Sequence, residues 1–343
     1  MRRRSPEADN PVAEVAAGIF RVTIPVPFQG LGAVQCYLLR GAEGWTLIDT
    51  GLHTPEAAAA WQKAWDTLGF GPEALERILL THAHPDHYGM AGRLQAEARA
   101  AGAKGDVPVR LSAREYELAR AYFQTDWRSE DRDPVDDFFA RCGAPPAVRA
   151  PSEHTMHWMV RATRPHPDRV VPIAYGETLV VGTRRLTALH TPGHSDGHLA
   201  FYDAADRLLL VGDQVLPHIT PNVGLWPGAE PDPLRRYLAS LHALHALDVR
   251  RALPGHGDVF TNWRERLREI EAHHAERLTL MREAAAPGAT VYDVARQAFD
   301  VDALHPEELR FAVAETLAHL EYLVGEGVLT RRENEVWRYR QAA

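Results

Sequence analysis

The N-terminal part of the chain alternates hydrophobic and polar residues in a way typical of β-strands. The segments GIFRVTIPVPF (18–28) and AVQCYLLRGAEGWTLIDTG (33–51) are rich in β-branched and aromatic residues and are broken by Gly and Pro. This pattern predicts successive antiparallel strands. The next segment, 54–70, has Thr54 at the N-cap position, Pro55 at the first helical position and a closing Gly, which predicts a helix.

Farther along, strand and helix patterns alternate. The apolar run RILL (77–80) precedes a helical pattern over 89–103, and a second strand and helix are expected over 107–123. Strand patterns return at 178–191, 199–213 and 249–257, with a helix over 232–247. A β-rich start followed by this alternation predicts a mixed α/β (α+β) domain.

Between about residues 124 and 172 the periodic pattern is lost, which indicates an insertion. Two explanations for its aromatic residues stay open: an apolar lid over a substrate, or the core of a small helical subdomain. The residues concerned, with three from the preceding helix, are Tyr116, Tyr122, Phe123, Trp127, Phe138, Phe139, His157 and Trp158.

The last part of the chain predicts a separate small unit. A long helix over 262–285, closed by Pro287 and Gly288, is followed by two helical patterns and a hairpin, an order that resembles a winged helix. We therefore expect a disordered tail at 1–14, a catalytic domain at 15–270, and a linking helix with a winged-helix-like domain at 271–343.

Composition and charge exclude several classes of protein. With 45% hydrophobic and 24% charged residues, the chain is expected to fold as a globular protein. The net charge of the chain is −8, and residues 287–343 contain six Arg, no Lys and ten acidic residues. Because an acidic unit repels phosphates, nucleic-acid binding is not expected. We expect the winged-helix-like unit instead to cover an apolar edge or to support a homodimer. No apolar run approaches the roughly 20 residues that span a membrane. Two distant cysteines and the lack of a signal-peptide pattern indicate a cytoplasmic protein.

Candidate metal ligands follow four apolar strands at the point where each strand ends. His82, His84, Asp86 and His87 follow RILL, and three further candidates follow later strands: His194, Asp213 and His256. If these strands are neighbours in one sheet, the seven side chains meet at one edge. Imidazole nitrogen and carboxylate oxygen together favour zinc, with iron or manganese as second choices. Seven donors are too many for one tetrahedral ion and suit two ions that share a bridging carboxylate.

The segments THAHPDH (81–87), TPGHSDGH (191–198), VGDQ (211–214), PGHGD (254–258) and LIDTG (47–51) together resemble the metallo-β-lactamase superfamily. The resemblance implies an αββα sandwich with a binuclear centre. It further implies that His82, His84 and His194 hold one ion, that Asp86, His87 and His256 hold the other, that Asp213 bridges them, and that Asp49 lies buried beneath them.

The function expected from this resemblance is hydrolysis of an ester, thioester or lactone of a small metabolite by a hydroxide bound to two Zn²⁺ ions, as in glyoxalase II-like enzymes. Asp86 is expected to orient that hydroxide as well as to bind metal. His218 and Asn222, just beyond Asp213, are candidates for the substrate pocket.

Other functions remain open. A ribonuclease or phosphodiesterase would use the same ions on phosphoryl groups, a persulfide dioxygenase-like enzyme would use one iron, and a metal-stabilised binding module would need no turnover. The motif GHSDG (193–197) also fits the nucleophile elbow of serine hydrolases with Ser195 as nucleophile. That motif needs a strand before it and a helix after it, whereas a strand pattern follows here.

Overall fold

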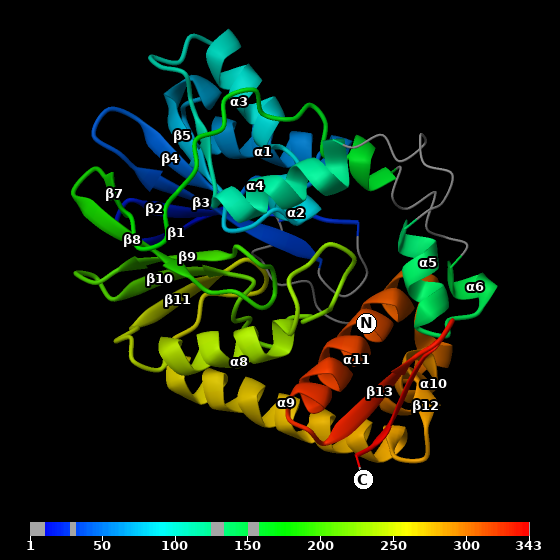
Figure 1. The fold of residues 1–343 in the computed structure, drawn as a ribbon. Helices are drawn as coiled ribbons and strands as arrows, with labels where there is room; N and C mark the ends of the chain where they lie inside the picture. Colours follow the sequence, from blue (N-terminus) through cyan, green and yellow to red (C-terminus); the bar gives the residue numbers. More distant parts are fainter. Residues whose placement is uncertain (1–10, 28–31, 125–133, 150–157, 343) are drawn as a thin grey trace, which may run out of the picture.

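Two β-sheets lie face to face between outer layers of helices (Figure 1). The computed structural model describes residues 11–27, 32–124, 134–149 and 158–342. Trp127 and His157 lie outside these ranges. Apolar side chains of both sheets, among them Leu39, Leu79, Phe201 and Leu210, form the central core. The predicted αββα sandwich is therefore confirmed.

The first sheet has six strands in the order β1-β2-β3-β4-β5-β6. The first four strands are antiparallel, as predicted, whereas β4, β5 and β6 are parallel. The strands are β1 (Val12–Ala16), β2 (Ile19–Pro25), β3 (Ala33–Arg40), β4 (Trp45–Ile48), β5 (Leu75–Leu79) and β6 (Val109–Arg110). The predicted disordered tail at 1–14 is wrong at its end, because Val12, Ala13 and Glu14 pair with β2.

The second sheet has five strands in the order β11-β10-β9-β8-β7. Strands β7 to β10 are antiparallel, and β10 pairs with β11 in parallel. The strands are β7 (Thr178–Val181), β8 (Arg184–His190), β9 (Leu199–Asp203), β10 (Leu208–Gly212) and β11 (Arg251–Pro254). Because β8, β10 and β11 run in the same direction, their C-terminal ends share one edge.

Helices cover both outer faces of the sandwich. Trp61 of α1 and Leu94 of α3 pack on the six-stranded sheet, and Tyr237 of α8 packs on the five-stranded sheet. These and the neighbouring helices are α1 (Pro55–Leu68), η2 (Pro72–Ala74), α2 (Pro85–Tyr88), α3 (Ala91–Ala100), α4 (Ala113–Ala119), η3 (Arg120–Gln124) and α8 (Pro233–Leu244). The predicted ends of α1 are confirmed: Thr54 Oγ1 accepts from the Ala57 N–H, and Gly69 closes the helix at a φ of 74°.

The C-terminal segment forms a separate core around a three-stranded sheet, β12-β14-β13. Its elements are α9 (Trp263–Ala285), β12 (Ala289–Thr290), α10 (Val291–Ala298), η5 (Val301–Ala303), α11 (Pro306–Gly325), β13 (Leu329–Glu333) and β14 (Trp337–Gln341). The two helices and the hairpin occur in the predicted order, and β12 is an addition. The boundary predicted at residue 270 falls inside α9, because Leu267 packs in the catalytic part and Met281 in the C-terminal core.

The described helices of the insertion belong to that C-terminal core. Phe139 of α5 (Pro134–Arg141) and Val148 of α6 (Pro146–Arg149) are buried against residues of α9, α10 and α11. Phe138 lies edge-on to Trp337, with ring centroids 5.9 Å apart. On the other side, Phe123 is buried in the core of the first sheet. The lid explanation is therefore wrong for Phe139 and Phe123, which are core residues.

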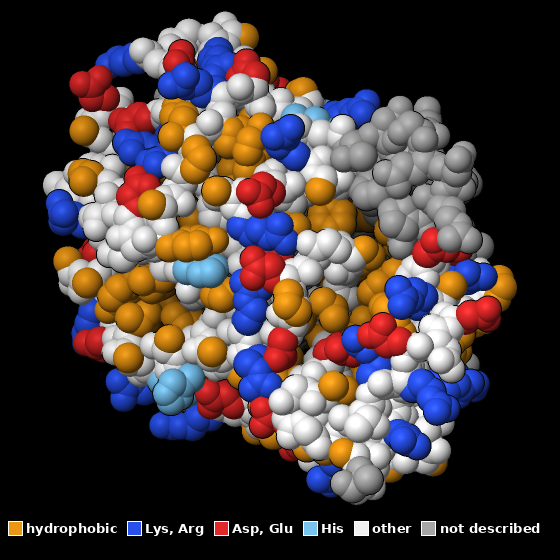
Figure 2. All heavy atoms as spheres, in the orientation of Figure 1, with side chains coloured by type: hydrophobic (Ala, Val, Ile, Leu, Met, Phe, Trp, Pro, Cys, Tyr) orange, Lys and Arg blue, Asp and Glu red, His pale blue; other side chains and the backbone are white. Residues whose placement is uncertain are grey.

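On the described surface in Figure 2, basic and acidic side chains are interspersed. No helix in the described ranges is both long enough and apolar enough to cross a membrane.

Candidate metal centre

Strand ends from both sheets deliver the candidate ligands to one edge of the sandwich. His82, His84, Asp86 and His87 follow β5 of the six-stranded sheet, and the other three candidates follow β8, β10 and β11 of the five-stranded sheet. The four strands are therefore not all neighbours in one sheet, which was the condition given for their convergence. The side chains still converge because the C-terminal ends of these strands lie at the same edge of two stacked sheets.

The first group consists of His82, His84 and His194, whose ring nitrogens lie within 4.8 Å of one another. His84 Nδ1 and His194 Nε2 are 3.0 Å apart. Burial lowers the pKa of all three imidazoles, and that of His84 falls to about 3. Neutral imidazoles have free lone pairs, which is the form that binds a metal.

The second group consists of Asp86, His87 and His256. His256 Nε2 lies 3.2 Å from Asp86 Oδ2, and His87 Nε2 lies 4.0 Å from the same oxygen. Burial favours neutral histidine, but Asp213 and Asp86 outweigh it and raise the pKa of His256 to about 10. Burial likewise opposes the charge of Asp86, whose pKa is nevertheless lowered to about 2, mainly by His87 and His256.

Asp213 lies between the two groups. Its Oδ2 is 3.8 Å from His194 Nε2 and 3.3 Å from His256 Nε2, and its Oδ1 is 3.4 Å from His87 Nε2. One carboxylate thus faces ligands of both groups, as a bridging ligand must.

Asp49 orients ligands of both groups from below. The His87 Nδ1–H donates to Asp49 Oδ2 at 2.9 Å. Thr81 donates its backbone N–H and its hydroxyl to the same carboxylate, and the Thr81 oxygen lies 2.9 Å from His82 Nδ1. Because Nδ1 of His82 and of His87 is used in these bonds, Nε2 of each ring faces the candidate metal site. A carboxylate commonly orients a metal-binding imidazole in this way.

Backbone carbonyls orient two of the remaining three histidines. The His256 Nδ1–H donates to Ala33 O at 2.7 Å, and the His194 Nδ1–H donates to Asn222 O at 2.8 Å. The Asn222 amide donates to Glu315 of α11 at 2.7 Å. The structure thus places Asn222, predicted to line the substrate pocket, behind a candidate ligand, whereas His218 is exposed and stays a candidate for the pocket.

Divalent metal ions fit this cluster. The Nε2 atoms of His82, His87 and His256 and Oδ1 of Asp213 are buried and have no hydrogen-bond partner among the described residues. Buried polar atoms without partners are costly, and a shared cation would satisfy them together. Nitrogen with carboxylate oxygen suits zinc, iron or manganese.

Three contributors were not predicted from the sequence. Glu115 and Glu315 come from helices far from the motifs, and His198 lies buried with its ring centroid 5.1 Å from that of His82. Only His198 had a local indication, because it closes the segment TPGHSDGH. The serine-hydrolase alternative is not supported, since β9 follows Ser195 and the Ser195 hydroxyl donates to Glu115 at 2.5 Å.

A sandwich with histidine and aspartate side chains at its strand ends defines the class of metal-binding αββα hydrolases. The chain belongs to the metallo-beta-lactamase superfamily: the model of that family matches residues 29–256, and the model of the metallo-beta-lactamase-like C-terminal domain matches residues 278–342.

Relatives span nearly the whole chain. A crystal structure of a metallo-beta-lactamase family protein from Thermus thermophilus is 33% identical, covers 96% of this chain and 100% of its own, and superposes with a TM-score of 0.83. A probable metallo-hydrolase of Bacillus subtilis is 25% identical over 91% of this chain and 94% of its own length. An acyl-coenzyme A thioesterase of Gallus gallus is 28% identical over 65% of this chain and 72% of its own. The chain is thus similar to metallo-hydrolases, including a thioesterase.

Proposed function

We propose that the chain hydrolyses an ester, thioester or lactone of a small metabolite at two divalent metal ions, zinc by preference. The observation that carries the proposal is the presence of two complete ligand groups, His82-His84-His194 and Asp86-His87-His256, on either side of Asp213. When bound, two such ions supply Lewis acidity and an activated water molecule.

The protein's own side chains have separable roles in this proposal. Asp86 is only 7% exposed and stays ionised, so its carboxylate could accept a hydrogen bond from the attacking water and hold it toward the substrate carbonyl. Asp49 and the Asn222 carbonyl keep the imidazoles in the required tautomer. His218 is proposed to contact the substrate.

A thioester is the first substrate to test. The thioesterase among the relatives supports it, and the acidic character of the chain, with a net charge of −8, disfavours phosphodiesters of nucleic acid. The complete second group argues for two ions rather than the single iron of a dioxygenase-like enzyme.

Elemental analysis of protein purified without chelator tests the proposal, together with turnover of acyl-coenzyme A, lactone and phosphodiester substrates. We expect about two metal ions per chain, and about one with no thioester turnover in His87→Ala. His242→Ala, on the exposed side of α8, is the control and should retain both ions.

Other outcomes would assign other functions. One iron per chain without hydrolysis would replace the hydrolase by the dioxygenase-like enzyme. Turnover of phosphodiesters alone would favour the phosphodiesterase, and bound metal without any turnover would favour a binding module.

A further inference from the structure

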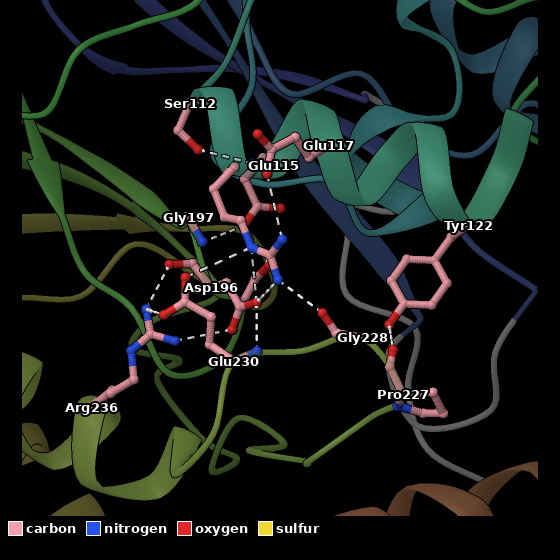
Figure 3. Close-up of polar contacts among 12 residues, drawn as sticks. Ser112, Glu115, Glu117, Tyr122, Asp196, Gly197, Pro227, Gly228, Glu230 and Arg236 are labelled. Atoms are coloured by element: carbon pink, nitrogen blue, oxygen red, sulfur yellow. Dashed lines mark hydrogen bonds and ion pairs between the residues drawn. The ribbon is translucent and has the colours of Figure 1, made fainter. Parts of the chain in front are cut away.

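The loops that carry the first ligand group come from different sheets and meet at one buried side chain. Glu115 lies in the first turn of α4 and is fully buried. Its Oε2 accepts the N–H of Ala83, the residue between His82 and His84, at 2.7 Å. Its Oε1 accepts the Gly197 N–H at 2.7 Å (Figure 3). The same oxygen accepts the Ser195 hydroxyl at 2.5 Å, and both donors lie in the loop that holds His194.

This arrangement is not the usual one for a glutamate at its position. Ser112 caps α4 by accepting the Glu115 N–H, and a Ser-x-x-Glu pattern normally turns the carboxylate back to the cap. Here both carboxylate oxygens face the ligand loops instead. A buried carboxylate is costly unless several donors satisfy it. Burial raises the pKa of Glu115 above its ordinary value, and these hydrogen bonds offset part of that rise.

The neighbouring residue holds the same loop from outside. Arg114 donates to Asp196 Oδ2 at 2.7 Å. Arg236 of α8 donates to Asp196 Oδ1 at 3.1 Å (Figure 3). A Cβ atom at Gly197 would lie 2.4 Å from Ser112 Oγ, so the loop can approach α4 this closely only because glycine stands there.

We propose that Glu115 is a positioning residue for the first metal ion: by joining the His82–His84 loop to the His194 loop, it fixes the spacing of ligands that two separate sheets contribute. This inference rests on the proposed metal centre. Glutamine cannot replace the carboxylate, because its NH₂ group must face either the Ala83 N–H or the Gly197 N–H, and one of these donors then loses its acceptor.

The test measures zinc affinity by competition with a chelating dye, in two backgrounds that isolate the groups. His87→Ala leaves only the first group complete, and His84→Ala leaves only the second. We expect Glu115→Gln to weaken zinc binding about 10- to 100-fold in the His87→Ala background and less than about threefold in the His84→Ala background. Ser195→Ala should weaken the first site only a few-fold, because both backbone donors remain.

Controls separate positioning from folding. Glu117→Gln changes an exposed glutamate of the same helix and should alter neither affinity. Melting of the metal-free proteins reports general loss of structure. Equal weakening of both sites, or a lower melting temperature with unchanged zinc affinity, would overturn the inference. If the Glu115→Gln variant does not fold, the Ser195→Ala variant decides instead. An unchanged zinc affinity of the first site in folded Ser195→Ala would overturn the inference.

The two proposals fail in different ways. A wild-type protein without bound metal would overturn the metal centre and, with it, the role of Glu115. A wild-type protein with two ions and a Glu115→Gln variant of equal affinity would overturn the role of Glu115 alone.

Discussion

The Asp49 carboxylate lies 2.9 Å from Nδ1 of His87 and reaches His82 through the Thr81 hydroxyl. Asp49 holds a left-handed backbone conformation, with a φ of 58°, at the end of β4. That conformation is uncommon outside glycine, and aspartate is one of the residues that tolerates it. A single buried side chain thereby orients one candidate ligand in each metal group.

Replacement of Asp49 by asparagine should weaken both metal sites. The NH₂ group then faces either the Thr81 N–H or both the Thr81 hydroxyl and the His87 N–H. At least one of these donors loses its acceptor, and the support of the imidazoles is weakened. We expect a 10- to 100-fold rise in the dissociation constant of each ion, measured by chelator competition. Asp66→Asn, on the exposed face of α1, serves as control. Affinities within about twofold of wild type in Asp49→Asn would contradict the prediction.

Gly193→Ala should destabilise the protein through two separate effects. Gly193 has a φ of +136°, and a Cβ atom there would lie 2.4 Å from Tyr237. Backbone strain and overpacking together should lower the free energy of unfolding by roughly 3 kcal/mol, measured by urea unfolding in the presence of chelator. Gly102→Ala has a φ of +93° with no atom within 4 Å of the new Cβ, and should cost only about 1–2 kcal/mol. Equal losses would show that the contact with Tyr237 is relieved.

Glu315 should make stability depend on pH between its two pKa values. Burial raises the pKa of the folded-state carboxyl to about 7 from an ordinary value of 4.5. Between these values the folded chain holds a proton that the unfolded chain lacks, so stability falls as pH rises and levels off above 7.

Glutamine does not ionise, so Glu315→Gln removes the loss of stability that occurs as pH rises. The new amide oxygen can still accept a hydrogen bond from Asn222. We expect the variant to match the wild type below about pH 4.5 and to exceed it by up to roughly 3 kcal/mol above pH 7, in urea unfolding at a series of pH values. Glu335→Gln, in an exposed turn, should follow the wild-type curve. Parallel curves for Glu315→Gln and wild type would refute the prediction.

Phe139→Ala should reveal the shared core of the insertion and the C-terminal segment. The Phe139 ring is fully buried among residues of the insertion and of the C-terminal segment. Its removal should therefore lower the free energy of unfolding by about 3–5 kcal/mol, measured by urea unfolding. Phe311 of α11 is 50% exposed, and Phe311→Ala should cost about 1 kcal/mol or less. Similar losses in the two variants would contradict the shared core.

The sequence by itself determined the features that depend on near neighbours. The ends of α1 follow from Thr54, Pro55 and Gly69, because caps act within a few residues. The antiparallel N-terminal strands follow from their residue types and turn residues in the same way. The ligand motifs at the strand ends, together with their family resemblance, identified the superfamily.

Only the tertiary structure decided which distant residues meet. The Ser112-x-x-Glu115 pattern is compatible with a simple helix cap, and the packing of α4 between two ligand loops is what turns the carboxylate toward them. In the same way, Asn222 became a support of His194 because α11 packs beside its loop. The same cause explains why the ligands are divided between two sheets and why Phe139 lies in a core shared with the C-terminal segment. Side-chain packing sets contacts between segments far apart in the chain, and no local pattern encodes them.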